Sequence, residues 1–215
     1  MLSINPADRQ PIEIYKLMTG LIVPRPVALV STMSKEGVAN LAPFSFFSGV
    51  GAVPPTVLFC PALRPVFSPE PGDAAFAEAA ERKDTLRNVE ETGEFVINVV
   101  SEAIAEAANA TSAEVAFGVD EFTLSGLTPI PSEVVRPPRV AQSPAQMECK
   151  LLQVIYTGHA ARSGVIVLGE IVRFHLREDL FDNFRVDPAA LDAVGRMAGN
   201  TWARTTDLIE LVRPK

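Results

Sequence analysis

Residues 25–47 read RPVALVSTMSKEGVANLAPFSFF. Within this stretch, residues 27–32 form a compact apolar run, which predicts a buried strand. Residues 34–37 predict a turn in which Gly37 adopts a positive φ angle. Residues 38–41 lead out of that turn, so we expect a β-hairpin. The stretch therefore predicts an antiparallel pair of strands at the start of a sheet.

Further apolar runs, separated by proline and glycine, extend the pattern along the chain. They predict strands over residues 44–53, 56–60, 94–100, 147–160, 165–176 and 207–212. Gly49 and Gly51 are expected bulge positions. Tight turns join neighbouring strands, and the turn at 162–164 creates a long two-stranded ribbon. The pattern favours a mainly β, mostly antiparallel fold that closes into a small β-barrel with short helices outside it.

Five short helices are expected between these strands, over residues 11–18, 74–81, 84–91, 101–110 and 189–194. The helix at 84–91 has Asp84 or Thr85 as a capping residue and ends at Gly93, and Ser101 is expected to cap the helix at 101–110. Residues 61–73 and 111–145 are proline-containing and predict loops. One domain over residues 1–215 accounts for the whole pattern.

Composition excludes several classes of protein. The chain has 215 residues, 47% hydrophobic and 21% charged, which is ordinary for a globular protein. Nineteen Lys and Arg against 26 Asp and Glu leave a formal charge of −7, which disfavours a nucleic-acid partner. Apolar stretches reach only about ten residues, against the ~20 of a membrane span. No signal peptide is visible, so we expect a cytoplasmic protein without a membrane partner.

The usual catalytic motifs are missing. The sequence contains no GxGxxG, no GxxxxGK[ST] and no GxSxG, which disfavours a Rossmann domain, a P-loop and a hydrolase elbow. Cys60 and Cys149 are interpreted as buried free thiols, and with His159 and His175 they lack the spacing of a metal site, so no metal is expected. The two histidines are interpreted as structural or surface residues.

Polar side chains gather at the mouth of the first hairpin. Ser31 and Thr32 end one strand, and Asn40 and Ser45 return on the next, beside three phenylalanines at 44, 46 and 47. Apolar walls with a few donors and acceptors suit a planar heteroaromatic ligand. The alternative interpretation is an ordinary hairpin stabilised by local side-chain hydrogen bonds.

Residues 82–88, RKDTLRN, are a second candidate site. A helix start exposes backbone N–H groups, Thr85 adds a hydroxyl and Lys83 adds a positive charge, a combination that suits a phosphate. Asp84 would repel a phosphate, so it is better interpreted as a cap or as a partner for ligand hydroxyls. The alternative is a capped surface helix.

These pieces together resemble the flavin reductase-like, FMN-binding split-barrel family, which includes flavoredoxin and the small components of two-component monooxygenases. The resemblance rests on an ordered set of motifs: RPVALVST, GVANLAPFSFF at 37–47, PPTVLF at 54–59, KDTLRN and TGEFVIN within 83–98, DEF at 120–122, Glu148-Cys149, LGEIV at 168–172 and RMAG at 196–199. The set covers residues 10–202. The family's last motif more usually reads RLGG followed by Tyr, whereas this chain has Met197, Ala198 and Trp202. Residues 65–82 form a stretch that is long for the family.

The resemblance implies a homodimeric split β-barrel with one FMN per subunit near the dimer interface. It assigns the cofactor-binding positions to Ser31, Thr32, Asn40, Leu41, Ala42, Ser45, Phe46, Lys83, Asp84, Thr85 and Arg196. In this assignment Lys83 and Thr85 would bind the phosphate. Phe46 would form part of the pocket wall, and Arg196 would approach the cofactor from the C-terminal segment.

The activity implied is that of an NAD(P)H-dependent flavin reductase. NADH or NADPH would pass hydride to flavin N5, and electrons would go on to flavin, oxygen or a partner monooxygenase. The resemblance leaves open a non-catalytic FMN-binding electron carrier like flavoredoxin. A structural barrel with a vacant pocket is the third hypothesis.

Overall fold

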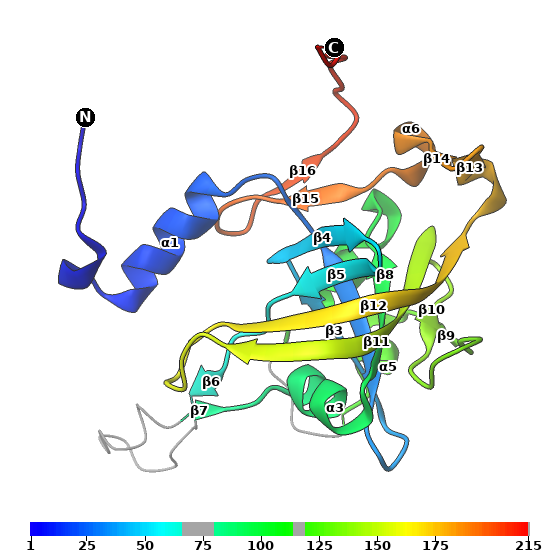
Figure 1. The fold of residues 1–215 in the computed structure, drawn as a ribbon, viewed down its shortest axis with the longest axis horizontal. Helices are drawn as coiled ribbons and strands as arrows, with labels where there is room; N and C mark the ends of the chain where they lie inside the picture. Colours follow the sequence, from blue (N-terminus) through cyan, green and yellow to red (C-terminus); the bar gives the residue numbers. More distant parts are fainter. Residues whose placement is uncertain (66–79, 114–118, 215) are drawn as a thin grey trace.

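A seven-stranded sheet forms the centre of the protein (Figure 1). The computed structural model describes residues 1–65, 80–113 and 119–214. Every pair in the sheet is antiparallel, and the strand order is β3-β2-β8-β11-β12-β5-β4. These strands are β2 (Ala28–Met33), β3 (Ala39–Phe44), β4 (Phe47–Ala52), β5 (Pro55–Phe59), β8 (Glu94–Val99), β11 (Ala145–Tyr156) and β12 (Val165–Leu176).

The first hairpin has the predicted register. Strands β2 and β3 pair so that Thr32 lies opposite Asn40. In the turn between them, Gly37 has a φ angle of 90°, and the Ser34 hydroxyl accepts the backbone N–H groups of Glu36 and Val38. Gly49 and Gly51 flank the register shift between β4 and β5, as expected for a bulge.

The sheet does not close into a barrel, so the prediction of a closed barrel is wrong. Strands β3 and β4 form its two edges, and no strand in the described residues pairs with the outer side of either one. The outer side of β3 is blocked, because the Leu41 N–H donates to the Glu121 carboxylate at 3.1 Å and Pro43 has no N–H. Turn patterns indicate which strands pair, but they do not show whether the two edges meet.

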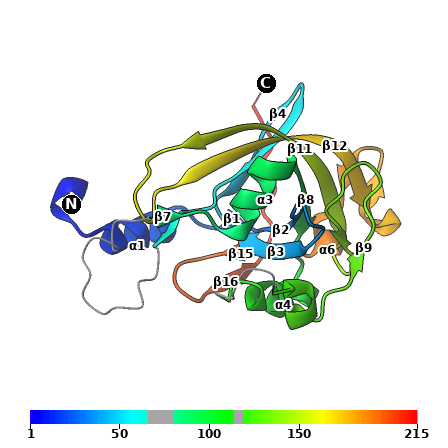
Figure 2. The ribbon, with the colours of Figure 1, turned by 90° about the horizontal axis from the view of Figure 1, so that it is seen from below.

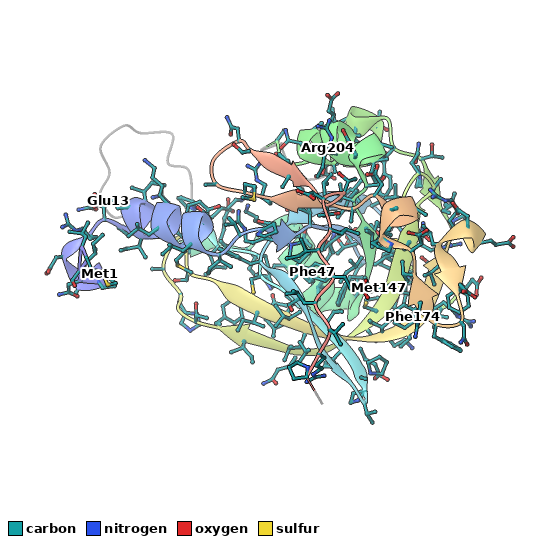
Figure 3. The ribbon with its side chains drawn as sticks, turned by 90° about the horizontal axis from the view of Figure 1, so that it is seen from above. Met1, Glu13, Phe47, Met147, Phe174 and Arg204 are labelled. Carbon is teal, nitrogen blue, oxygen red and sulfur yellow. The ribbon has the colours of Figure 1, made fainter. Side chains whose placement is uncertain are left out.

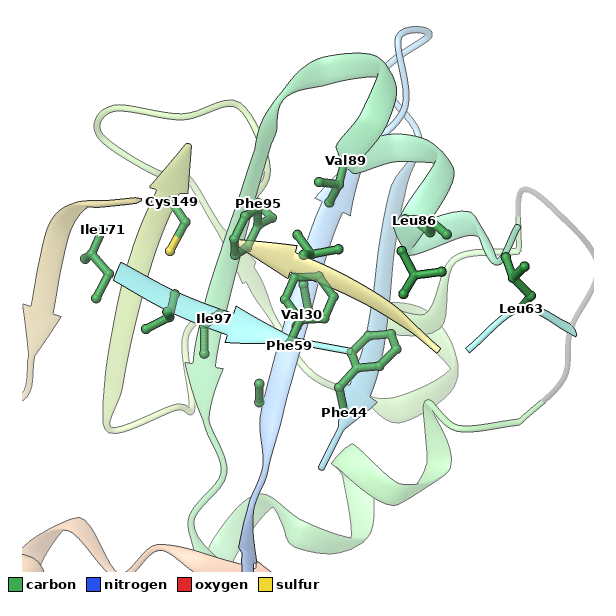
Figure 4. Packing of buried hydrophobic residues seen from close by; sticks show 14 residues of the cluster. Val30, Phe44, Phe59, Leu63, Leu86, Val89, Phe95, Ile97, Cys149 and Ile171 are labelled. Atoms are coloured by element: carbon green, nitrogen blue, oxygen red, sulfur yellow. The ribbon is translucent and has the colours of Figure 1, made fainter. Parts of the chain in front are cut away.

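The larger of two cores lies between the sheet and helix α3 (Asp84–Thr92) (Figure 4). At its centre the ring of Phe59 lies 5.1 Å from that of Phe44 and 5.3 Å from that of Phe95. A Cβ atom at Gly169 would come within 2.3 Å of the Phe95 ring, so this glycine allows the ring to lie against β12.

A second core lies on the opposite face of β2 and β3, where α4 (Ala105–Ala110) packs (Figure 2). It contains Val27, Leu29, Leu41, Val100, Ile104, Ala108, Phe122, Leu127, Val140 and Val194. Because side chains alternate along a strand, Val30 and Leu29 enter different cores. The two cores hold β2 and β3 rigidly from both sides.

Shorter elements surround this sheet. The remaining helices are η1 (Pro6–Asp8), α1 (Pro11–Leu21), η2 (Glu102–Ile104), α5 (Glu121–Ser125), η3 (Glu178–Leu180) and α6 (Pro188–Leu191). The remaining strands are β1 (Arg25–Pro26), β6 (Arg64–Pro65), β7 (Ala80–Glu81), β9 (Pro129–Ile130), β10 (Arg139–Val140), β13 (Phe181–Asp182), β14 (Arg185–Val186), β15 (Val194–Arg196) and β16 (Trp202–Arg204).

Helix α3 ends as predicted but begins differently. Gly93 follows it in the left-handed conformation, with φ 72°. Its N-cap residue is Lys83, and no side chain caps its first turn, so the expected cap from Asp84 or Thr85 is wrong. The Thr85 hydroxyl is instead held by the β3 side chain Asn40. Ser101 also makes no side-chain cap, because a 3₁₀ turn precedes α4.

Other expectations need correction. Residues 207–212 form no strand, and the last strand is β16. The predicted loop at 111–145 contains α5 and the β9–β10 pair. The predicted helix at 74–81 lies outside the described residues except for its last two, which form β7, and most of the long stretch at 65–82 lies outside them too. Alanine-rich runs and proline counts carry little information about such tertiary pairing.

Helix α1 projects away from the sheet, as the position of Glu13 relative to Phe47 shows (Figure 3). Most of its apolar side chains are exposed, with Leu21 at 81%, although Tyr15 lies edge-on to the Phe46 ring at 6.5 Å. The C-terminal tail after β16 is extended and also exposed, with Ile209 at 83%.

Candidate functional site

A pocket opens at the edge of β3, beside the first turn of α3. Its lining residues come from β3, β6, the start of α3, the segment after α4, and α5: Asn40, Ala42, Pro43, Phe44, Arg64, Lys83, Asp84, Thr85, Thr111, Ser112, Ala113 and Glu121. The cavity volume is about 110 Å³. Pockets that enclose a whole small-molecule ligand measure about 300–1,000 Å³. This pocket therefore suits one end of a larger ligand.

A buried hydrogen-bond network joins the hairpin to α3 at this pocket. The Asn40 amide donates to the Thr85 hydroxyl at 2.9 Å and to the Thr32 hydroxyl at 3.3 Å. The Asn88 amide also donates to Thr32, at 3.0 Å. Three of these residues were predicted cofactor contacts, and the structure brings them together. Asn88 was missed, although it lies in the RKDTLRN motif one helical turn after Thr85.

Two oxygen atoms of α3 are buried and accept no hydrogen bond in the described part of the chain: Asp84 Oδ1 and Asn88 Oδ1. Leaving a buried acceptor without a donor costs about 1–3 kcal/mol. Native structures rarely keep such atoms unless something else satisfies them. Since Asp84 does not cap its helix, these oxygens indicate a ligand that carries hydrogen-bond donors.

Positively charged groups line another part of the same pocket. Lys83 is exposed and precedes α3, whose first backbone N–H groups lack intrahelical acceptors. Arg64 also lines the pocket and is paired with Glu81 at 2.7 Å. An ammonium group beside a helix N-terminus attracts an anion.

Glu121 is a buried carboxyl in this pocket that sequence reasoning missed. It is 6% exposed, and its Oε2 accepts the Leu41 N–H. Burial raises the pKa of Glu121, the Leu41 N–H opposes that rise, and the nearby Asp84 and Asp120 add to it. The DEF motif contains this residue, but only the topology brings it against β3.

A second polar cluster forms around Arg25, another residue that sequence reasoning missed. Its guanidinium donates to the Ser45 hydroxyl at 3.2 Å and lies 5.8 Å from the centre of the Phe46 ring. It also donates to three backbone carbonyls, those of Thr19, Ile22 and Met197. Arg25 thus connects helix α1, the residues that follow β3 and the C-terminal segment by direct hydrogen bonds.

Arg196 lies next to this cluster. It is the register partner of Arg25 in the β1–β15 pair, and its guanidinium stacks 5.2 Å from the centre of the Trp202 ring. The predicted residues therefore form two groups. Asn40, Ala42, Lys83, Asp84 and Thr85 line the pocket with Thr32 behind them, and Ser45, Phe46 and Arg196 surround Arg25.

Ser31 and Leu41 point to the other face of the hairpin. The Ser31 hydroxyl donates to the Pro138 carbonyl at 2.5 Å, and Leu41 packs in the second core. Their side chains do not line the pocket. Contact with a cofactor through their backbones stays a prediction.

The histidines lie elsewhere. The His159 ring stacks on Tyr156. His175 Nε2 lies 2.6 Å from Glu148, a fully buried carboxylate that also accepts three backbone N–H groups from residues 133–135. No histidine lines the pocket at β3 within the described ranges.

Two kinds of feature are absent from the described residues. No group of three or more His, Cys, Asp or Glu side chains is arranged to hold a metal ion. No helix there combines the length and apolar character needed to cross a bilayer.

The model of the flavin reductase-like domain family matches residues 19–198. The chain belongs to this family. The matched segment includes both polar groups of the site, from Arg25 to Arg196.

Solved structures agree with this assignment. The flavin reductase-like chain is 38% identical to nitrilotriacetate monooxygenase component B from Bacillus cereus, with a TM-score of 0.88 and 98% of each chain covered. It is 31% identical to the 2-nitrobenzoate 2-nitroreductase of Pseudomonas fluorescens, with a TM-score of 0.84, covering 99% of this chain and 96% of that one. A split-barrel protein of the flavin reductase type from Shewanella frigidimarina is 22% identical with a TM-score of 0.81 over the full length of both chains, and it shows the shared fold.

The sequence resemblance is thus confirmed, and so is the mostly antiparallel split-barrel fold. Family and neighbours together place the chain among flavin-related oxidoreductases.

Proposed function

We propose that this protein is an NAD(P)H-dependent flavin reductase that binds FMN at the β3–α3 pocket. The observation that carries the proposal is the chemistry of that pocket. Asp84, whose buried Oδ1 has no donor among the described residues, lines the pocket next to Lys83 at the N-terminus of α3. A ligand with hydroxyl groups and a phosphate satisfies both features, and the ribityl phosphate of FMN has both.

The residues present fit this cofactor. Lys83 and the first N–H groups of α3 suit the phosphate, and Asp84 Oδ1 suits a ribityl hydroxyl. The cavity of about 110 Å³ is large enough for that end of FMN only. We place the ring system outside it, towards Ser45 and Phe46, where Arg25 holds the wall in position.

When bound, FMN would supply the hydride and electron transfer chemistry. The chain's own residues would bind it, orient it and shield one side of it. Among the described residues that line the pocket, none is a histidine that could act as an acid or base. Arg196 lies next to the Arg25 cluster and stacks on Trp202, which packs against the second core, and we place the approach of a nicotinamide on this side of the flavin.

We further propose that the protein is a homodimer and that its reduced flavin serves oxygen, free flavin or a partner monooxygenase. One neighbour is itself component B of a monooxygenase, which supports a partner of that class. The small cavity leaves the rest of the cofactor without a second wall, and in our proposal a partner subunit would provide that wall.

Anaerobic titration tests the activity. The purified chain is loaded with FMN and mixed with excess NADH or NADPH while the flavin absorbance is followed. We expect rapid bleaching with at least one of the two nicotinamides. If dithionite bleaches the flavin and neither nicotinamide does, the protein is an electron carrier. A chain that takes up neither FMN nor FAD contradicts the whole proposal.

A further inference from the structure

Two carboxyl groups line the pocket that we assign to a phosphorylated ligand. Asp84 and Glu121 both face it, together with the cations Lys83 and Arg64. A site for an anion would gain nothing from ionised carboxylates, because like charges in one small cavity repel. The protonation state of Glu121 can explain why carboxyl groups are present in such a site.

The charged groups that face Glu121 come from three elements. Lys83 at the N-cap of α3 and Asp84 in its first turn come from one side, strand β6 contributes Arg64, and the residue before α5 contributes Asp120. Strand β3 and the segment at 111–113 contribute no titratable side chain to the pocket. Glu81 already pairs with Arg64. Lys83 is therefore left as the cation opposite three carboxyl groups.

The hydrogen bonding of Glu121 suits either protonation state. Oε2 accepts the Leu41 N–H at 3.1 Å, and the residue's own backbone N–H also acts to lower the pKa of the carboxyl. A neutral carboxyl keeps the first bond and adds an O–H donor. It can thus stay bound to β3 while it donates to an anionic oxygen of a ligand.

Resting on the proposed function, we propose that Glu121 is a specificity residue that binds the phosphate of FMN as a neutral acid. Binding then takes up one proton from solvent, which is held on the Glu121 carboxyl. Ionised Glu121 repels a phosphate, so affinity for FMN falls as pH rises. Riboflavin has no phosphate and does not drive this proton uptake.

Burial favours the same state. Desolvation is the largest influence on Glu121 and raises the pKa of its carboxyl, and Asp84 and Asp120 raise it further. A phosphate in the pocket would add negative charge and raise the pKa of the Glu121 carboxyl further.

The experiment measures the dissociation constants of FMN and riboflavin between pH 6 and pH 9. It compares the flavin-free full-length chain with Glu121→Gln and with Glu91→Gln. Glutamine keeps an oxygen for the Leu41 N–H and presents N–H donors to the pocket. Glu91 is exposed on α3 and outside the pocket, so Glu91→Gln is a control for the same change in net charge.

We expect the affinity of the wild type for FMN to fall by up to about tenfold per pH unit relative to Glu121→Gln, because one proton is coupled to binding. The ionisation of FMN itself is common to all three proteins and cancels in the comparison. Glu91→Gln should follow the wild type. Riboflavin should give the same pH profile with all three proteins.

Two results overturn the inference: FMN profiles of the wild type and Glu121→Gln that run parallel, or weaker FMN binding by Glu121→Gln at pH 8.5. A wild type that binds neither flavin at any pH contradicts the proposed function instead, so the two failures are distinguishable.

Discussion

Two buried glutamates with opposite pKa directions show how local donors decide the state of a carboxyl. Burial by itself raises the pKa of Glu148, but three backbone N–H groups and His175 outweigh it and hold the pKa below the usual value. Burial is the largest influence on Glu121 and raises the pKa of its carboxyl, and two acidic neighbours raise it further, while the Leu41 N–H and the residue's own N–H offset only part of this rise. The first is therefore a structural anion, and the second is free to change its protonation state in a ligand site.

Glu148→Gln should destabilise the fold. An amide presents one acceptor and one donor group where the carboxylate satisfied four donors, and charged hydrogen bonds contribute about 1.5–3 kcal/mol each. We expect the free energy of unfolding at pH 7 to fall by about 2–3 kcal/mol in urea denaturation. Glu133→Gln, which removes an exposed carboxylate, should change it by less than about 0.5 kcal/mol.

The pH dependence of stability follows from the same bonds. Because the pKa of folded Glu148 lies below its ordinary value of 4.5, this group adds stability above that pH. The added stability disappears as pH falls through the folded-state pKa. We expect acid denaturation curves of Glu148→Gln to be flatter than those of the wild type below pH 4.5. Curves of equal steepness would contradict this role.

The substitution Lys83→Ala should weaken the binding of FMN more than the binding of riboflavin. A charge-assisted hydrogen bond is worth about 1.5–3 kcal/mol, or roughly 10–150-fold in affinity. Lys35 lies in the turn between β2 and β3 and does not line the pocket, so Lys35→Ala serves as the control. Equal losses for both flavins, measured by fluorescence quenching, would show that Lys83 does not contact the phosphate.

Alternation along a strand limits what a motif can say about single residues. Thr32 and Asn40 face the pocket side, whereas Ser31 and Leu41, one position away on each strand, face the second core. The motif predicts all four together, because it does not separate side-chain contacts from backbone contacts. Arg25 was missed for a related reason, since its partners come from distant parts of the chain.

At the scale of elements, the sequence predicted the features that depend on neighbouring residues alone. Apolar runs and turn glycines located the strands of the sheet, and Gly93 marked the end of α3. The open edge of β3 and the start of α3 were not predicted, because both depend on tertiary hydrogen bonds made by Glu121 and Asn40. The bond from Asn40 to Thr85 holds the first turn of α3 at the pocket.

Gly93→Ala should destabilise the protein through the end of α3. Its φ of 72° is left-handed, and no atom lies within 4 Å of the added Cβ, so strain is the only cost, about 1–2 kcal/mol. Gly20→Ala in α1 also meets open space but has a helical backbone, so we expect it to be neutral or stabilising. Thermal unfolding of both variants checks the contrast, and equal shifts would contradict it.

The whole molecule exposes apolar surface at both ends of the chain. Leu21 on α1 is 81% exposed, and Ile209 and Leu211 in the tail are each 83% exposed. Large exposed apolar side chains that gather on a surface often mark an interaction site. Figure 1 shows both segments extending from the sheet rather than folding back on it. Together with the small cavity, this exposure favours a second copy of the chain as the missing wall of the site.

We therefore expect light scattering to give a mass twice that of the 23.1 kDa chain. Replacing Ile209 and Leu211 by serine removes apolar area from the interface that we propose, so it should shift the protein towards monomer and lower FMN occupancy in parallel. Phe184 is 92% exposed in the turn between β13 and β14, on the far side of the sheet from α1, and Phe184→Ser is the matched control. A monomeric wild type with full FMN occupancy would contradict the dimer, and it would place the whole flavin site within one chain.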